Sequence, residues 1–461
     1  MSKFLIAAIV LAGLLAGAAH AQWLDTTFDV GSGPRALVYD SVSDKIYCAN
    51  GLSDSVTVID GASDTVITFL AVGTSPYALC CNPQDNKVYC SHVNRDSVTV
   101  INGASNHVVA TVVADSWPDA LCYNPQENKV YCANHWSNNV TVIDGASNQV
   151  ITTVTAGLGP QALCYNPQDN KVYCANWQSN NVTVIDGASD TVIATVMADS
   201  GPEALCYNLR DDRVYCANIW SASVTVINGA SNQVVTTVEA DSDPEALCYN
   251  AQNNKVYCAN FKSGNVTVID GASNQAITTV TTGTSLVALC YNAQDDKVYC
   301  ANCGSNDVTV IDGASNSVVK DIWVGNSPCA MTCNPARDRI YVANYEYNTV
   351  SVIQDSALVG MQGRAPLVKH RLTLGTYPNP FSEQVCLRLT VIGLRPELRV
   401  YDVNGALVRD LSPTRSLAPS PSCSLTWDGT DGLGRRLPVG IYVVRLTDGT
   451  ANVNRKILLL R

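Results

Sequence analysis

The chain has 461 residues, of which 40 are acidic and 29 are basic, so its formal net charge is −11. This acidic balance argues against nucleic acid or anionic lipid as a binding partner, because both carry the same sign of charge. The length exceeds one ordinary compact core and favours a fold that grows by repetition.

The N-terminus has the features of a secretory signal at residues 1–21. Basic Lys3 precedes an apolar run from Phe4 to Ala18, and Ala19-His20-Ala21 is typical of a cleavage site. The apolar run is short for a membrane span. We therefore expect a secreted chain that begins at Gln22, without a transmembrane segment once the signal is removed.

A sequence repeat of 42 residues, called the word below, then occurs eight times without insertion or deletion. Its marker is a tyrosine, found at Tyr47, Tyr89, Tyr131, Tyr173, Tyr215, Tyr257, Tyr299 and Tyr341, and in six of the eight copies it opens a Tyr-Cys-Ala-Asn motif. Alternating β-branched residues, as in Val140 to Ile143, indicate strands, and turn sequences divide each word into four of them. Four-stranded units of this length in tandem are typical of a β-propeller.

The first and last strands of the repeat region are predicted to share one blade. Leu24 to Gly31 aligns with the fourth strand of the word, whereas no fourth strand follows Ile353 in the eighth copy. Pairing the two ends would remove two free sheet edges. We therefore predict an all-β chain in which residues 22–355 form an eight-bladed β-propeller, closed by an N-terminal strand.

The repeat stops before a predicted linker at residues 356–371, which is basic and contains Gly and Pro. Residues 372–461 are predicted to form a small Ig-like β-sandwich, because turn sequences separate short apolar runs. The predicted strands are Gln384 to Val391, Glu397 to Asp402, Ala406 to Leu411, Cys423 to Trp427, Gly440 to Leu446 and Arg455 to Leu460.

The repeats resemble the YVTN-type β-propeller repeat. The eighth copy is the best match, with Tyr341-Val342-Ala343-Asn344 followed by Val350-Ser351-Val352-Ile353. The other seven copies have Cys where that family usually has Val. The resemblance implies a secreted or surface propeller and leaves the activity open.

The C-terminal unit resembles the C-terminal sorting domain of the type IX secretion system, which is similar to the Ig-like domain of flagellar hook-capping proteins. The matching segments include Tyr377-Pro378-Asn379-Pro380-Phe381, Trp427-Asp428-Gly429 and Gly440-Ile441-Tyr442. The resemblance implies that the type IX secretion machinery is a partner and that the protein reaches the outer cell surface or the medium. The alternative is a plain Ig-like module without a sorting role.

Six copies of the word carry two cysteines ten residues apart, on either side of the first turn. If Asn124 faces Val130 across this turn, Cys122 lies directly opposite Cys132, and the pair could oxidise. The cross-strand disulfides of this interpretation are Cys80–Cys90, Cys122–Cys132, Cys164–Cys174, Cys206–Cys216, Cys248–Cys258 and Cys290–Cys300, with Cys386–Cys423 in the C-terminal unit. The alternative is buried thiols that replace Ala or Val.

No metal or cofactor is expected in the repeats. The histidines His92, His107 and His135 do not recur at one position of the word, as a repeated metal site would require.

The copies differ mainly in two loops, one between the second and third strands and one between the fourth strand and the next word. Both loops are predicted to lie on one rim of the propeller. They contain the aromatic residues Trp117, Trp136, Trp177, Trp220 and Phe261 and the carboxylates Asp119, Glu203 and Glu245. We predict a ligand site there, for a glycan stacked on the indoles or for a basic protein segment. The alternative is that each ring only packs over the neighbouring blade.

These patterns favour a secreted binding or adhesion module, with a purely structural surface protein as the alternative. No Gly-x-Ser-x-Gly motif and no base beside a nucleophile is found, so an enzyme is not expected. A lyase or glycosidase would have to use the rim carboxylates.

Overall fold

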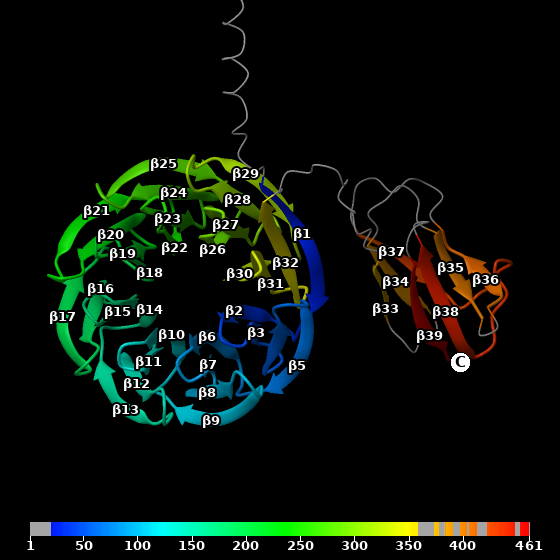
Figure 1. Cartoon of the computed structure of the whole chain (residues 1–461), viewed down its shortest axis with the longest axis horizontal. Helices are drawn as coiled ribbons and strands as arrows, with labels where there is room; N and C mark the ends of the chain where they lie inside the picture. Colours follow the sequence, from blue (N-terminus) through cyan, green and yellow to red (C-terminus); the bar gives the residue numbers. More distant parts are fainter. Residues whose placement is uncertain are drawn as a thin grey trace, which may run out of the picture. The chain divides into compact units, whose positions relative to one another are not determined.

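Eight four-stranded antiparallel sheets form a ring in this computed structural model (Figure 1). The structure describes residues 20–357, 373–377, 382, 384–390, 397–402, 405–412, 422–447 and 452–460. Most of the predicted signal (1–21) and of the predicted linker (356–371) lies outside these ranges. The chain divides into two compact units between Val359 and Gly360. Within the described ranges, no helix has the length and hydropathy needed to cross a bilayer.

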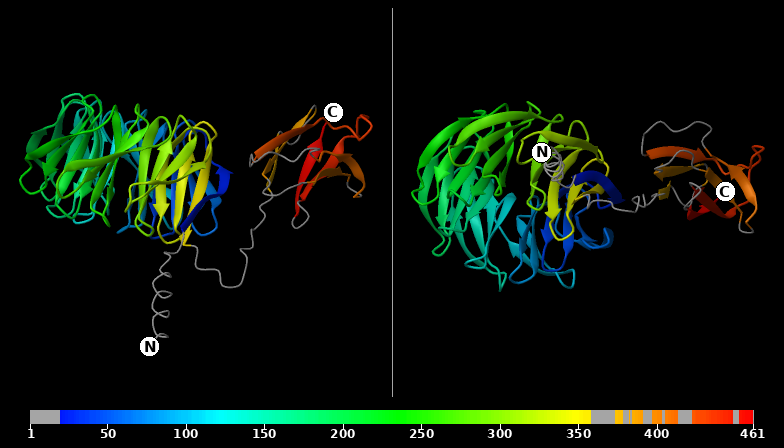
Figure 2. Two further views of the ribbon diagram at one scale, coloured as in Figure 1. Left: turned by 90° about the horizontal axis from the view of Figure 1, so that it is seen from above. Right: turned by 45° about the horizontal axis from the view of Figure 1, so that its top comes forward.

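The four strands of each blade follow one another outward from the ring axis, and they run between the two faces of the ring (Figures 1 and 2). The innermost strands are β2 (Pro34–Asp40), β6 (Pro76–Asn82), β10 (Pro118–Asn124), β14 (Pro160–Asn166), β18 (Pro202–Asn208), β22 (Pro244–Asn250), β26 (Leu286–Asn292) and β30 (Pro328–Asn334). The second strands are β3 (Lys45–Asn50), β7 (Lys87–His92), β11 (Lys129–Asn134), β15 (Lys171–Asn176), β19 (Arg213–Asn218), β23 (Lys255–Asn260), β27 (Lys297–Asn302) and β31 (Arg339–Asn344).

The outer half of each blade completes the sheet. The third strands are β4 (Ser55–Asp60), β8 (Ser97–Asn102), β12 (Asn139–Asp144), β16 (Asn181–Asp186), β20 (Ser223–Asn228), β24 (Asn265–Asp270), β28 (Asp307–Asp312) and β32 (Thr349–Ala357). The outermost strands are β5 (Thr65–Ala71), β9 (His107–Val113), β13 (Val150–Thr155), β17 (Thr191–Met197), β21 (Val234–Glu239), β25 (Gln275–Thr281), β29 (Val318–Trp323) and β1 (His20–Asp29). We number the blades from β2–β5 (blade 1) to the blade of β30, β31, β32 and β1 (blade 8).

The predicted closure by the N-terminal strand is confirmed. Strand β1 pairs antiparallel with β32, with Leu24 opposite Ile353 and Phe28 opposite Val350. The first strand of the chain is therefore the outermost strand of the last blade, as Figure 1 shows. Both free edges that an open array would expose are satisfied by this pairing.

The core lies between neighbouring blades, where the second and third strands pack face to face. Tyr131, Val140 and Val142 of blade 3 contact Val172 and Cys174 of blade 4, and all five are buried. Burial of one such side chain contributes about 2 kcal/mol. The cysteine of the second strand in blades 1 to 7 is therefore a small core side chain, and Val342 takes its place in blade 8.

Hydrogen bonds also join the blades. The Tyr131 hydroxyl donates to Asp190 Oδ1 at 2.7 Å, and Lys129 Nζ donates to Asp190 Oδ2 at 2.8 Å. Both groups also reach the carbonyl oxygen of Gly187, at 3.3 and 3.0 Å. The tyrosine of the repeated word thus holds the turn of the next blade.

The first hairpin of each blade differs from the predicted register by one residue. Asn124 pairs with Lys129, which leaves Cys122 opposite Tyr131 and Cys132 opposite Leu121. The reason is the four-residue turn, in which Asn128 adopts φ 52° and makes the loop even instead of odd. A slip of one residue sends two side chains to opposite faces. The predicted disulfides Cys80–Cys90, Cys122–Cys132, Cys164–Cys174, Cys206–Cys216, Cys248–Cys258 and Cys290–Cys300 are therefore wrong, and these cysteines are free thiols.

The C-terminal unit is a sandwich of two sheets, with strand orders β33-β34-β37 and β36-β35-β38-β39. Its strands are β33 (Thr373–Tyr377), β34 (Val385–Thr390), β35 (Glu397–Tyr401), β36 (Leu407–Asp410), β37 (Ser422–Trp427), β38 (Gly440–Thr447) and β39 (Asn452–Leu459). Buried residues of both sheets, such as Leu387, Val400, Trp427 and Val444, form its core. All six predicted strands are present, whereas β33 was not predicted.

The predicted disulfide Cys386–Cys423 falls on neighbouring strands of this sandwich. Cys386 is paired with Thr426, and Cys423 with Leu389, so the two cysteines are not opposite each other in the ladder. Their side chains lie outside the described part of the structure, and this disulfide stays a prediction.

Candidate ligand-binding site

The second residue of each innermost strand lies beside the ring axis, on the rim where the variable loops meet. The loops meet because the end of the second strand pairs with the start of the first, as Asn134 does with Pro118. We call these eight residues the axial ring: Arg35, Tyr77, Asp119, Gln161, Glu203, Glu245, Val287 and Cys329. The predicted rim carboxylates Asp119, Glu203 and Glu245 are all members of it.

Burial makes the carboxyl groups of the axial ring weak acids. It raises the pKa of Asp119 to about 6, although the charge of Arg35 and the side chains of Trp117 and Tyr77, which donate hydrogen bonds to it, oppose the rise. It also raises the pKa of Glu203 to about 7, with the charges of Glu245 and Asp119 adding to the effect, and the pKa of Glu245 to about 7. Gln161 Nε2 donates to Glu203 Oε1 at 3.3 Å. These groups change protonation near neutral pH.

A histidine stands beside the most deeply buried of these carboxylates. His135 Nδ1 lies 3.6 Å from Asp119 Oδ2, and burial lowers the pKa of His135. Asp119 is only 7% exposed, and among the described residues neither its Oδ1 nor His135 Nδ1 has a hydrogen-bond partner. Buried polar atoms without partners are costly and mark a place for a ligand or water. Sequence reasoning missed His135, because its only signal was its place in a variable loop.

Four tryptophans form an aromatic arc over blades 3 to 5. The rings of Trp117 and Trp136 stack at 5.4 Å, and those of Trp177 and Trp220 lie 4.4 Å apart. The ring of His135 lies 6.3 Å from that of Trp177. Trp136 and Trp220 remain 68% and 57% exposed. The predicted Phe261 lies half-buried in a corresponding loop of blade 6.

The aromatic arc borders a hollow and includes a strained residue. The hollow has a volume of about 310 Å³ and is lined by His135, Trp136, Asn138 and Gln178. Trp117 has φ 62°, at a position where other blades have glycine, serine or aspartate. A bulky residue there costs about 1 kcal/mol. Backbone strain at a bulky side chain points to a functional role.

The opposite side of the axial ring is different in character. Val287 and Cys329 occupy it, and Cys329 Sγ donates to the carbonyl oxygen of Pro34 at 3.1 Å. Burial, with Cys303 nearby, raises the pKa of Cys329 to about 12. This thiol is therefore neutral and lies beside Cys303 of the neighbouring loop. The site is confined to the side with the aromatic arc.

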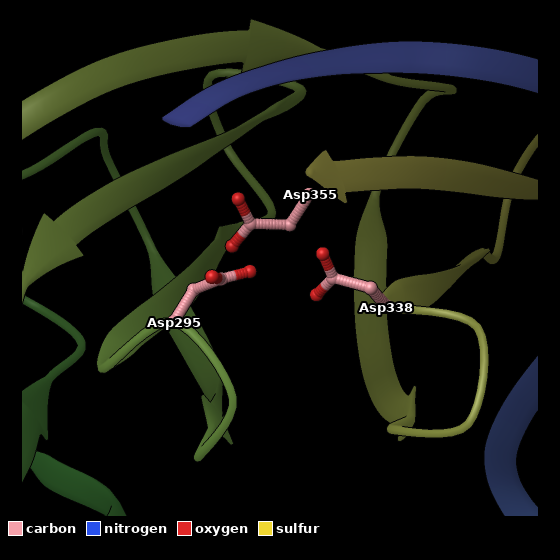
Figure 3. A group of neighbouring side chains, drawn as sticks. All are labelled: Asp295, Asp338 and Asp355. Carbon is pink, nitrogen blue, oxygen red and sulfur yellow. The ribbon is translucent and has the colours of Figure 1, made fainter. Parts of the chain in front are cut away.

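A second group of carboxylates lies at the junction where the ring closes (Figure 3). Asp295, Asp338 and Asp355 have oxygen atoms within 4.8 Å of one another. Asp355 accepts hydrogen bonds from Tyr299 at 2.5 Å and from Gln22 at 2.7 Å. Burial and the neighbouring carboxylates raise the pKa of Asp338 to about 7. Asn292 of β26 and Lys297 of β27 also contact Asp355, so its partners come from β1, β26 and β27, and this cluster has a structural role in closure.

Fold and site together define a β-propeller with a separate C-terminal export domain. Residues 375–460 match the family model of the secretion system C-terminal sorting domain. The predicted sorting domain is confirmed, and the protein is secreted to the cell surface or the medium. Type IX secretion machinery is its partner in export.

The propeller has more distant relatives. Residues 18–150 match the family model described as lactonase, 7-bladed beta-propeller, whereas this chain has eight blades. The solved structure of Kuenenia stuttgartiensis hydrazine synthase is similar over 72% of this chain and 98% of that chain, with a TM-score of 0.53 and 18% identity. At this identity the likeness shows the fold alone. No curated protein matches the chain.

The expectation that the chain is not an enzyme is contradicted by these comparisons. The family model that matches the first blades is that of the lactonases, which are named for an enzymatic activity. The motif argument failed because acid–base groups of a propeller come from separate blades, and such groups leave no local sequence motif.

Proposed function

We propose that the propeller is a secreted glycan-binding module whose site combines the aromatic arc with the carboxyl groups of the axial ring. The exposed indoles of Trp136 and Trp220 are the observation that carries this proposal. Each contacts a second indole, so the pair presents a firm apolar surface beside polar groups. Such surfaces are favoured at recognition sites, where a sugar ring stacks on the indole.

Polar groups next to the arc would orient the sugar. Asp119 Oδ1 has no partner among the described residues and would accept a hydrogen bond from a hydroxyl group. Gln161, one blade from Trp136, and Glu203, two blades from it, offer further hydrogen-bond donors and acceptors. A hydrogen bond to a group that is otherwise buried and unpaired contributes more than one exchanged with water.

A glycan array with the purified propeller tests this proposal. Substitution of Trp136, Trp177 and Trp220 with alanine should lower binding at least tenfold and leave the circular dichroism spectrum unchanged. Trp323→Ala is the matched control, because Trp323 is 67% exposed but lies on outermost strand β29. Equal loss in the control would reject the site, and the absence of any ligand for the parent protein would favour a purely structural role.

A second candidate function is hydrolysis at the same site. Glu203 and Glu245 have pKa values of about 7, which suits general acid–base catalysis at neutral pH. The match to the lactonase model supports lactones and related esters as substrates. Turnover of a lactone panel should fall at least a hundredfold in Glu203→Gln. Turnover that survives both Glu203→Gln and Glu245→Gln would exclude these groups.

A further inference from the structure

We propose that the glycan recognised by the axial ring is cationic, namely an oligosaccharide of amino sugars with free ammonium groups. This inference rests on the proposed glycan binding and adds the charge of the ligand. It follows from the charges around the ring, the one buried carboxylate oxygen without a hydrogen-bond partner and the nature of the aromatic arc.

The axial ring has more carboxyl groups than cations to pair with them. Its only cation, Arg35, lies 4.3 Å above the ring of Tyr77, on the far side of Asp119 from Glu203. Lys262, a cation in the rim loop of blade 6, is paired with Asp243 at 2.7 Å. Glu203 is therefore next to other acids and the neutral amide of Gln161. A ligand that supplies a positive charge would remove this imbalance.

Asp119 provides the second, independent observation. Its side chain is more than nine-tenths buried, and its Oδ1 atom has no hydrogen-bond partner among the described residues. The nearby His135 is disfavoured as a cation, because burial lowers its pKa. An ammonium group has three donors and one charge, and it would satisfy this oxygen better than a hydroxyl group does.

The aromatic arc suits the same ligand. Indole is the best aromatic partner for a cation, and desolvated contacts of this kind contribute about 2 kcal/mol. Trp136 and Trp220 also offer flat surfaces to the apolar face of a sugar ring, which a lysine side chain lacks. An amino sugar uses both properties, and this favours a cationic glycan over a basic peptide.

Binding of a cation should also release protons. Below about pH 7 the carboxyl groups of Glu203 and Glu245 hold their protons in the free protein. A bound ammonium group stabilises the ionised form and lowers both pKa values. Titratable groups that face this pair are Asp119, Asp243 and Tyr77. Arg35 and His135 lie at Asp119, and Lys262 is paired with Asp243.

The test is calorimetry of the full chain with two oligosaccharides that differ only in acetylation, a glucosamine oligomer and its N-acetylated counterpart. At about pH 6 the amine oligomer should bind at least tenfold tighter. Its binding heat should depend on the ionisation enthalpy of the buffer, because protons are released. Glu203→Gln with Glu245→Gln should remove the tenfold preference for the amine oligomer, because it removes both carboxylates that would pair with the ammonium groups. Glu239→Gln, on exposed outer strand β21, is the control.

The outcomes separate the two proposals. Equal affinity for both oligomers would overturn the charge assignment and keep glycan binding. Failure of both oligomers to bind would overturn this inference, and a negative glycan array would then overturn the proposed function as well. Tighter binding of an oligolysine peptide would overturn the assignment to a sugar.

Discussion

Two junctions between blades can be compared: the regular one between blades 3 and 4, and the closing one between blades 7 and 8. Both have a tyrosine and a lysine on one side, but the groups that face them on the other side differ. In the regular junction, Tyr131 and Lys129 reach backbone oxygens of the next turn and Asp190. At the closing junction Tyr299 instead reaches Asp355, which occupies the position of that turn's glycine. One buried carboxylate thus replaces several backbone acceptors, because the closing strand comes from the other end of the chain.

The largest effect is expected from deletion of residues 22–30, which removes most of closing strand β1. Blade 8 would lose its outer ladder and expose the edge of β32. At about 1 kcal/mol for each ladder hydrogen bond, the loss is on the order of 5 kcal/mol. Chemical denaturation measures it, and a peptide of the deleted sequence should restore stability. An unchanged midpoint would show that closure contributes nothing.

Asp355→Ala is expected to destabilise the ring by about 3 kcal/mol, because it leaves the Tyr299 hydroxyl and the Gln22 amide buried without an acceptor. Asp190→Ala should cost less, since the Gly187 carbonyl still accepts from Tyr131. Thermal unfolding of both variants makes the comparison. Equal losses would mean that the two junctions are energetically alike.

Asp338→Asn should make stability less dependent on pH. Burial and the neighbouring acids raise the folded-state pKa of Asp338 to about 7, above the value of 3.8 for an ordinary aspartate. The folded state therefore binds this proton more tightly, and stability falls as pH rises from about 4 to about 7. The variant should be more stable than the parent at about pH 8, with a difference that disappears towards about pH 4.

Asp85→Asn is the control for this substitution. Asp85 already accepts a hydrogen bond from Asn128 at 2.9 Å in a regular junction, so no gain is expected. A gain of the same size in this variant would assign the effect to net charge and not to the closing junction.

The smallest effect on stability is expected from Trp136→Ala. The side chain is 68% exposed, so the free energy of unfolding should change by less than about 0.5 kcal/mol. Tyr131→Phe removes a buried hydroxyl from the framework and should cost about 1 kcal/mol. Both are measured by urea denaturation. A larger loss in Trp136→Ala would place this ring in the framework and not in a binding surface.

Sequence reasoning predicted the strands and the closure but misjudged one register. Local pattern alone was sufficient for both: the alternation in Val140 to Ile143 predicted the strands, and the alignment of Leu24 with the fourth strand predicted the closure. The pairing of Cys122 depended on the conformation of one turn residue, Asn128, and a single residue reverses the face of every side chain.

The candidate site was predicted in its composition but not in its geometry. The indoles and the acids were found because they vary where the framework is constant. The contact of His135 with Asp119 joins the second-strand loop to the start of the first strand, and no spacing in the sequence reveals it. The same is true of the acid cluster at closure, where Gln22 from the other end of the propeller donates a hydrogen bond to Asp355.

The sequence by itself determined the period, the number of blades, the closing strand and the export domain. These features follow from local alternation and repetition, and the same pattern recurs in every copy of the repeat. Only the tertiary structure decided which side chains meet, namely the buried Asp119 beside His135 and the buried Asp355 beside Tyr299. The physical reason is that burial and unpaired charge are properties of assembled blades, and no single copy of the word contains them.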